Sequence, residues 1–170
     1  QLQKNMTKAD FLILNGNQSE LRELAKSTKA QVIFFTTDSV EKNGAYLLNN
    51  DLWYQDEKIM AASELGVPGS HNIENALAAI IVAKLSGVSN EKIKETLSRF
   101  SGVPHRTEFI GEFNGRKIYN DSKATNILAT ERALSGFNKE QLILIAGGLD
   151  RGNGFDELIP MIQGLKGLVA

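Results

Sequence analysis

The sequence predicts an α/β fold in two parts, the first built on a mostly parallel sheet with an attached β-hairpin. Short apolar runs alternate with stretches at helical spacing, which is typical of strands joined by helices that cover the sheet. The apolar runs are nearly continuous, as expected for strands buried on both faces of a parallel sheet. A chain of 170 residues, 42% of them hydrophobic, is long enough to bury such a core.

The first part opens with a predicted strand, helix and strand at residues 9–15, 19–25 and 32–35. Residues 45–48 and 52–54 then predict a β-hairpin, because these short apolar runs flank a turn of two asparagines and an aspartate. The sheet therefore gains an antiparallel extension.

Two helices are predicted next. The first carries one apolar stripe, made of Ile73, Ala76, Leu77, Ile80, Ile81 and Leu85. The second runs over about residues 89–100, with Ser89 as its N-cap and Val88 able to pack against Ile93. Residues 101–104 (SGVP) then break the helical pattern, since glycine and proline together stop a helix. We therefore expect a domain boundary here, with one part at residues 1–102 and the other at 103–170.

The second part opens with a hairpin, because the runs at residues 107–111 and 117–120 flank an Asn-Gly turn. A helix, a strand and a helix are then predicted at about residues 126–135, 142–146 and 155–163. Residues 164–170 predict the start of a further strand, and the chain opens without methionine. We therefore expect a piece of a longer protein.

Composition limits the classes of partner. With 19 basic and 20 acidic residues and a net charge of -1, the chain lacks the basic surplus that is typical of nucleic-acid binding. The absence of cysteine excludes disulfides and thiolate chemistry, and it favours a cytoplasmic location. The apolar stretches are too short to span a bilayer, and the first residues show no signal-peptide pattern, so no membrane partner is expected.

The stretch YNDSKATN, at residues 119–126, gathers charged and hydroxyl side chains between a predicted strand and a predicted helix. Ligands of open α/β sheets lie at such junctions, where free backbone N–H groups favour an anion. Lys123 could hold a carboxylate or phosphate, and Asp121 could bind a sugar hydroxyl, a metal or an amine. A polar turn with Thr125 or Asn126 as the helix N-cap explains the same residues equally well.

Three further stretches carry candidate site residues. Asn72 and Asn75 share one face of a helical first turn, so their amides could contact the edge of a nucleobase, although capping would explain one of them. His105 and Arg106 follow the predicted domain boundary, where a guanidinium is well placed to bind phosphate. The loop GGLDRGNG, at residues 147–154, does not match the dinucleotide-binding glycine pattern, and no stretch of the chain matches a P-loop.

Taken in order, the stretches GSHNIENALAA, SGVPHRTE, YNDSKATN and AGGLDRG resemble the Mur ligases of bacterial cell-wall synthesis. The asparagine pair and the His-Arg pair are shared widely in that family, whereas NDSKATN is similar to its D-glutamate-adding branch. The resemblance covers nearly the whole chain but only a middle slice of the three-domain family chain. It implies that residues 1–102 are the later part of a central ATPase-type domain and that 103–170 begin a Rossmann-like domain.

The resemblance implies an ADP-forming amide ligase that uses ATP and Mg²⁺. The γ-phosphate of ATP passes to the alanine carboxylate of UDP-N-acetylmuramoyl-L-alanine, and the amine of D-glutamate then displaces phosphate. Magnesium and cationic side chains neutralise the charge that develops on the reacting groups. The family's P-loop and its carbamylated metal-site lysine are expected before Gln1, so we expect no metal ligand within this chain and no activity from the isolated piece.

The resemblance also implies roles for single residues. The residues implied to bind ATP are Asn72, Asn75, Arg106 and Asp121. The residues implied to bind D-glutamate are Ser122, Lys123, Thr125 and Arg151. The residues implied to act in catalysis are His105, Arg106 and Lys123. We expect small-molecule substrates and a monomer; the open alternatives are another Mur or folylpolyglutamate-type amide ligase and a non-catalytic nucleotide-binding module.

Overall fold

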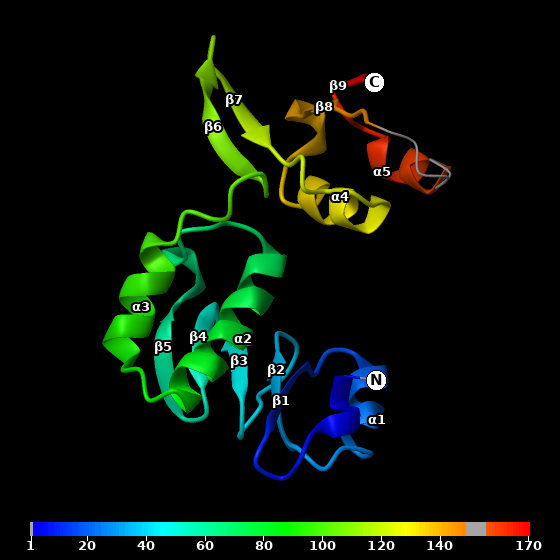
Figure 1. The fold of residues 1–170 in the computed structure, drawn as a ribbon. Coiled ribbons are helices and arrows are strands. Elements are labelled where there is room, and N and C mark those ends of the chain that lie inside the picture. The colour runs from blue at the N-terminus through cyan, green and yellow to red at the C-terminus, as the bar shows by residue number, and fades with distance from the viewer. Residues whose placement is uncertain (1, 149–155) are drawn as a thin grey trace. The chain divides into compact units, whose positions relative to one another are not determined.

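The computed structural model describes residues 2–148 and 156–170 (Figure 1). It divides into two compact units, Gln1–Ser101 and Gly102–Ala170, which we call unit 1 and unit 2. Each unit is built from its own strands and helices, and each is described here by itself.

Unit 1 contains a five-stranded sheet in which the strand order follows the chain. Its strands are β1 (Phe11–Asn15), β2 (Gln31–Thr36), β3 (Ala45–Leu48), β4 (Asp51–Tyr54) and β5 (Glu57–Ala61). The first three strands are parallel to one another, and β4 and β5 extend the sheet as an antiparallel meander. The predicted α/β class is confirmed, and Asn49 and Asn50 form the predicted turn with φ of 51° and 63°.

Strand β5 was not predicted from the sequence. Its first two residues, Glu57 and Lys58, are exposed, and the two buried residues, Ile59 and Met60, are adjacent rather than alternating. Strand recognition depends on alternation or on a longer apolar run, and this strand has neither. A register irregularity between β4 and β5, at Leu52 and Trp53, accompanies this departure from simple alternation.

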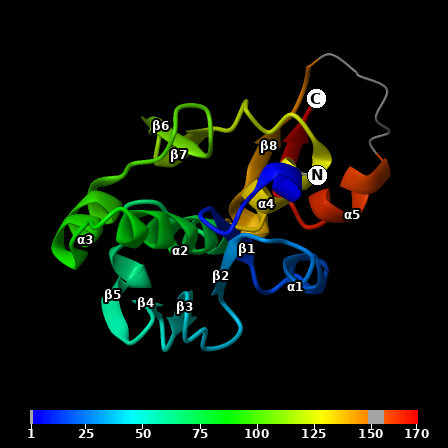
Figure 2. The ribbon, with the colours of Figure 1, turned by 60° about the horizontal axis from the view of Figure 1, so that its bottom comes forward.

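The helices of unit 1 are α1 (Ser19–Ala25), α2 (Ser70–Leu85) and α3 (Asn90–Arg99). Helix α2 packs on strands β1 to β4 and α3 packs on β5, so the two helices form a layer on one face of the sheet (Figure 2). Ile33 and Phe35 point toward that layer, and Phe34 points the opposite way. The guanidinium of Arg22 in α1 lies 4.6 Å from the centre of the Phe34 ring, so α1 covers the other face.

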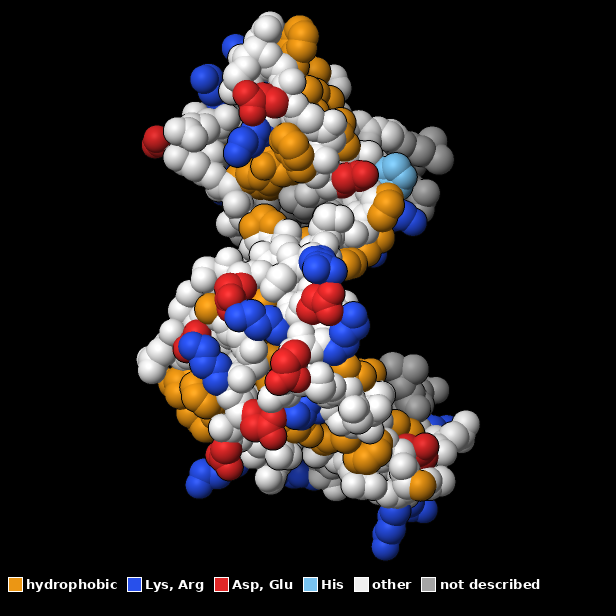
Figure 3. Space-filling view, turned by 90° about the vertical axis from the view of Figure 1, so that its left-hand side faces the viewer, with side chains coloured by type: hydrophobic (Ala, Val, Ile, Leu, Met, Phe, Trp, Pro, Cys, Tyr) orange, Lys and Arg blue, Asp and Glu red, His pale blue; other side chains and the backbone are white. Residues whose placement is uncertain are grey.

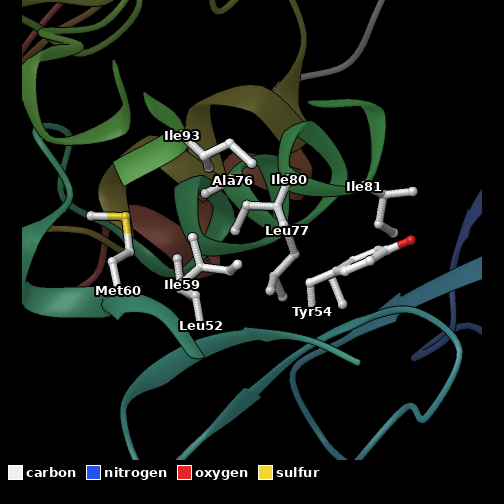
Figure 4. Close-up of a cluster of buried hydrophobic side chains, with 10 residues drawn as sticks. Leu52, Tyr54, Ile59, Met60, Ala76, Leu77, Ile80, Ile81 and Ile93 are labelled. Atoms are coloured by element: carbon white, nitrogen blue, oxygen red, sulfur yellow. The ribbon is translucent and has the colours of Figure 1, made fainter. Parts of the chain in front are cut away.

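The hydrophobic core of unit 1 lies between α2, α3 and strands β3 to β5 (Figure 4). Leu77, Ile80 and Ile81 on α2 are fully buried and point toward the strands, where they meet Leu52 and other buried side chains. The spacing of these α2 residues is the stripe that the sequence predicts. Burial of each large apolar side chain stabilises the fold by about 1.5–3 kcal/mol.

Unit 2 begins with a β-hairpin of β6 (Glu108–Phe113) and β7 (Arg116–Asn120). Asn114 and Gly115 form its turn with φ of 50° and 72°, as the Asn-Gly signal predicts. Helix α4 (Ile127–Leu134) follows, and Asn126 caps it by accepting a 2.8 Å hydrogen bond from the Ala129 N–H. Strands β8 (Ile143–Ile145) and β9 (Gly167–Val169) then form a parallel pair.

The predicted helix at 155–163 is wrong in length. The structure has a 3₁₀ turn at Asp156–Leu158 followed by the single turn α5 (Ile159–Ile162), and Phe155 lies outside the described residues. Pro160 has no N–H to donate and suits only the first turn of a helix, which limits any regular helix before it. Gly164, with φ of 84°, then ends the segment. The other 3₁₀ turns are at Leu2–Asn5, Ala62–Glu64 and Lys139–Gln141.

The exposed face of α3 carries basic and acidic side chains side by side (Figure 3). Lys92 and Arg99 both pair with Glu95, and Lys94 pairs with Glu64. Opposite charges interspersed in this way give a solvated surface without a single-sign field. Over the residues that the structure describes, no helix is long and apolar enough to cross a membrane.

Candidate functional site

The stretch at residues 121–126 is a tight connection between β7 and α4. The Ala124 N–H donates to the Asp121 carbonyl at 2.8 Å, and the Thr125 N–H donates to the Lys123 carbonyl at 2.9 Å. These bonds turn the chain, so the Ser122, Lys123 and Thr125 side chains are exposed on a compact loop. In the described part of unit 2, β7 pairs with β6 and not with the parallel strands β8 and β9. The junction therefore follows a strand of the predicted hairpin, and not one of the parallel strands at whose ends ligands of open α/β sheets lie.

The loop that carries His105 and Arg106 has an unusual backbone. His105 has φ of 66° and Thr107 has φ of 45°, a region that residues with a Cβ seldom adopt. The Arg106 N–H donates to the Val103 carbonyl at 3.1 Å, and the His105 N–H donates to Oε2 of Glu108 at 2.7 Å. Hydrogen bonds from two consecutive backbone N–H groups thus hold the chain in this conformation.

The structure brings these two loops together by hydrogen bonds between residues far apart in the sequence. The Lys123 N–H donates to the His105 carbonyl at 3.0 Å. The Thr107 N–H donates to Oδ1 of Asp121 at 2.8 Å, and the Thr107 hydroxyl lies 3.4 Å from the same oxygen. We call residues 105–108 and 120–125, joined in this way, the two-loop site.

Two cationic side chains project from the two-loop site. Arg106 and Lys123 are exposed, and among the described residues neither side chain forms an ion pair or a hydrogen bond. Each of these two cations can donate to a phosphate or a carboxylate, whereas the carboxylates of Glu108 and Asp121 in the same site accept from backbone N–H groups. The two side chains are therefore available to bind an anion, and the hydroxyl groups of Ser122 and Thr125 belong to the same exposed loop.

Asn72 and Asn75 lie together at the start of α2, in unit 1. Nδ2 of Asn72 donates to the Pro68 carbonyl at 2.7 Å, and Nδ2 of Asn75 lies 3.3 Å from Oδ1 of Asn72. The two amides are therefore ordered by each other and by the preceding loop, with the Asn75 side chain exposed. This matches the shared face that the sequence predicts for them. His71 is half-buried, and its ring lies against Gly69, which has φ of 107°.

Three members of the two-loop site were missed by reasoning from the sequence: Thr107, Glu108 and Asn120. Each of them forms a hydrogen bond within the site. None carries a fully exposed charge like those of Arg106 and Lys123. The only available signal was their position within the quoted stretches HRTE and YNDSKATN. Arg151, which was also predicted as a site residue, lies outside the described residues. The described residues contain no group of three or more side chains arranged to hold a metal ion.

Comparisons with known proteins identify the family. Residues 1–83 match the family model described as Mur ligase middle domain. The UDP-N-acetylmuramoylalanine--D-glutamate ligase of Enterococcus hirae is 66% identical over 99% of this chain. The chain belongs to the Mur ligase family. The enzyme of the same name from Streptococcus mutans is 61% identical over 99% of the chain.

Two solved structures support the fold of this Mur ligase chain. A UDP-N-acetylmuramoylalanyl-D-glutamyl-2,6-diaminopimelate--D-alanyl-D-alanyl ligase from Acinetobacter baumannii has a TM-score of 0.56 at 19% identity, over 94% of this chain and 42% of that one. The folylpolyglutamate synthetase from Lactobacillus casei has a TM-score of 0.54 at 18% identity, over 87% and 38%. The predicted relationship to Mur ligases is confirmed. The chain spans 36% and 37% of the length of the two curated relatives named above.

Proposed function

We propose that the whole protein is an ATP-dependent ligase that joins D-glutamate to UDP-N-acetylmuramoyl-L-alanine, with an acyl phosphate as intermediate. The observation that carries this proposal is the joining of the His105 loop to the Asp121–Lys123 loop, which brings together the two loops that carry Arg106 and Lys123. The 66% identity to a relative named as a D-glutamate ligase supports the choice of amino acid.

We propose that the two units bind different parts of the substrates. Unit 1 is the later part of the central ATP-binding domain, and unit 2 is the first part of the C-terminal domain. Asn72 and Asn75 contact the adenosine of ATP, since their ordered amides offer both donors and acceptors. Arg106 binds phosphate oxygens, because a guanidinium is always charged and can donate two parallel hydrogen bonds.

Asp121 has one carboxylate oxygen engaged with Thr107, which leaves the other as an acceptor for the ribose hydroxyls. Ser122, Lys123 and Thr125 bind D-glutamate, a dicarboxylate that an ammonium and two hydroxyls suit well. Arg151 belongs to the same proposed set, by resemblance alone. His105 lies next to the reacting groups.

The reaction needs charge neutralisation more than covalent chemistry by the protein. A carboxylate is a poor electrophile, and phosphorylation converts it to an acyl phosphate that an amine can attack. Negative charge builds on the phosphoryl oxygens and on the tetrahedral intermediate, and preorganised cations lower that barrier. Mg²⁺ supplies further positive charge in such reactions. The described residues offer no cluster of metal ligands, so we assign no Mg²⁺ ligand among them.

We propose that the protein is located in the cytoplasm, because the nucleotide substrates of this reaction are found there. We propose a monomer that acts on small molecules, with neither nucleic acid nor membrane as a partner. The even balance of 19 basic and 20 acidic residues supports the first of these exclusions.

The decisive experiment measures phosphate release by the full-length protein with ATP and UDP-N-acetylmuramoyl-L-alanine, comparing D-glutamate with L-glutamate and L-lysine. We expect turnover with D-glutamate alone. Lys123→Ala should lower kcat/KM for D-glutamate by about 10–100-fold, the equivalent of one charge-assisted hydrogen bond. Lys117→Ala is the matched control, because Lys117 is an exposed lysine on β7 outside the two-loop site, and its removal should leave turnover unchanged.

Other results would redirect the proposal. Turnover with a different amino acid would indicate another amide ligase of the superfamily. ATP binding without ligation would indicate a nucleotide-binding module. The isolated 170-residue chain is expected to give no turnover, and D-glutamate-dependent phosphate release from it would contradict the proposed need for the rest of the protein.

A further inference from the structure

Asn120 is hydrogen-bonded at both ends of its side-chain amide. It is the last residue of β7 and is half-buried. Its Oδ1 accepts from the Ser122 N–H at 3.1 Å, and its Nδ2 lies 2.8 Å from Nδ1 of His105. The amide therefore bridges the two loops of the two-loop site, in addition to the backbone bond from Lys123 to His105.

The contact with Ser122 fixes which way the amide faces. A backbone N–H can only donate, so the amide atom opposite it must be the oxygen. The amide nitrogen then faces His105. Because an amide NH₂ group only donates, Nδ1 of His105 must accept this bond with its lone pair.

The protonation pattern of the ring follows from this geometry. A neutral imidazole carries one proton, and when Nδ1 is an acceptor the proton is on Nε2. The His105 side chain is 53% exposed, and within the described residues Nε2 has no hydrogen-bond partner. The ring therefore offers a free N–H donor.

Glu108 acts on the same histidine in the opposite sense. Its Oε2 lies 3.8 Å from Nδ1 of His105, and a carboxylate so placed would favour a proton on Nδ1. The same oxygen accepts from the His105 backbone N–H at the shorter distance of 2.7 Å. Glu108 is thus committed to the backbone, and Asn120 is the side chain within hydrogen-bond distance of Nδ1.

We propose that Asn120 is a positioning residue that holds His105 in the Nε2–H tautomer, so that His105 donates a hydrogen bond from Nε2. Its catalytic consequence rests on the proposed function: the Nε2–H donates to an oxygen of the reacting phosphoryl or acyl group, and no proton is transferred. Asn120 itself contacts no substrate in this scheme, because both of its polar atoms are used within the loops.

Nitrogen-15 NMR of the imidazole rings tests the tautomer directly in the 170-residue chain. The chain has two histidines, so His71→Gln identifies the signals of His105. At a pH at which the spectra show neutral imidazole rings, we expect His105 in the Nε2–H form. A free imidazole also favours this form, so the unaltered chain alone does not test the proposal. The variants of Asn120 provide the test.

Asn120→Asp changes one atom, replacing the donor Nδ2 with a carboxylate oxygen while the other oxygen still faces Ser122. We expect His105 to shift to the Nδ1–H tautomer, since the new oxygen can only accept. Asn114→Asp is the matched control, because it makes the same change at the exposed turn of the same hairpin, and His105 should not respond.

An unchanged His105 tautomer in Asn120→Asp, with the backbone amide spectrum intact, would overturn the proposal. If that variant does not fold, Asn120→Ala serves instead, and its tautomer ratio should relax to that of an exposed histidine. A ratio that stays as in the unaltered chain would again overturn it.

Kinetics of the full-length protein test the catalytic consequence. Asn120→Asp should lower kcat at least about 10-fold, with KM for ATP and D-glutamate changed by no more than about twofold. If the unaltered protein lacks D-glutamate-dependent turnover, the proposed function fails, and the NMR result still decides the role of Asn120. A shifted tautomer with unchanged kcat would overturn the catalytic consequence alone.

Discussion

Asp121 supports the fold as well as the proposed nucleotide site, and the two roles use different properties of its carboxylate. Oδ1 accepts from the Thr107 N–H, which holds a residue with φ of 45° in place. We expect Asp121→Ala to lower the free energy of unfolding of unit 2 by about 1–2 kcal/mol, because a backbone donor loses its charged acceptor. Asp121→Asn keeps an oxygen in that position and should cost less than about 0.5 kcal/mol. Urea unfolding followed by circular dichroism measures both.

The two Asp121 variants separate structure from function. If the second carboxylate oxygen binds the ribose, Asp121→Asn should raise KM for ATP in the full-length protein while leaving stability nearly unchanged. Thr107→Val is the control for the hydroxyl, whose 3.4 Å contact is long enough that its loss should change stability little. Equal destabilisation by Asn and Ala at position 121 would show that the charge, not the hydrogen bond to Thr107, holds the loop.

At the scale of single residues, Arg106 and Lys123 were predicted as site residues, and their roles stay predictions, whereas the side chains that hydrogen-bond within the two loops were not predicted. Arg106 was predicted because it follows the predicted domain boundary, and Lys123 because it lies between a predicted strand and a predicted helix. Asn120 and Glu108 have no such signature, since their roles depend on which residues the hairpin brings opposite one another. That information is absent from residue type and local spacing.

At the scale of elements, the pairing of β6 with β7 assembles the two-loop site. Glu108 lies opposite Asn120 at the open end of the hairpin, so the residues just before β6 and just after β7 become neighbours. The Asn-Gly turn sets the pairing near the tip, and this was predictable. A bulge between Phe109 and Gly111 then shifts the register by one residue, and no sequence signal indicated it.

A second element-scale feature links strand β5 to the helices that cover it. Oε2 of Glu57 accepts from Nζ of Lys84 at 2.8 Å and from Nδ2 of Asn90 at 2.7 Å, and Lys84 also donates to Oδ1 of Asn90 at 2.9 Å. The pKa of Glu57 lies below its ordinary value. The hydrogen bond from Lys84 is the largest cause, and the hydrogen bond from Asn90 and the positive charge of Lys84 add to it. One carboxylate thus connects β5, α2 and the start of α3.

This network predicts acid sensitivity of unit 1. A lowered pKa in the folded state means that Glu57 stabilises the fold above its unfolded-state pKa of about 4.3, and that this contribution is lost as the pH falls through the lower folded-state value. The stability difference between the unaltered chain and Glu57→Gln should therefore be constant near pH 7 and should shrink below about pH 4. Urea unfolding across this pH range, followed by the fluorescence of Trp53, measures the difference.

The partner variant tests whether the effect belongs to the network. Lys84→Met removes the hydrogen bond and the charge that lower the pKa of Glu57, so adding Glu57→Gln to it should change the stability less than Glu57→Gln does alone. Full additivity of the two substitutions at pH 7 would contradict the assignment of the pKa shift to Lys84.

At the scale of the whole molecule, the division near residue 101 separates two units of unequal core. All ten buried residues of the hydrophobic core cluster lie in unit 1, between Ala45 and Ile93. In the described part of unit 2, Leu134 is the one buried hydrophobic residue, while Phe113 and Ile145 are 69% and 79% exposed. Glycine and proline at residues 101–104 were the sequence signal for the predicted boundary, but hydrophobic content alone could not reveal the difference between the two cores, since both parts are rich in apolar residues.

Because unit 2 has far fewer buried hydrophobic residues than unit 1, we expect the 170-residue chain to unfold in two steps, with unit 2 first. Stability rises with the apolar area buried, so a unit that buries little of it unfolds at lower urea concentration. Trp53 is the only tryptophan and lies in β4, so its fluorescence reports on unit 1 alone, whereas circular dichroism reports on both units. We expect the circular dichroism signal to begin its change at lower urea than the fluorescence, and a chain of residues 1–101 to keep the fluorescence transition. Coincident transitions of the two signals would mean that the units unfold together, and the packing of each unit by itself would then not determine its stability.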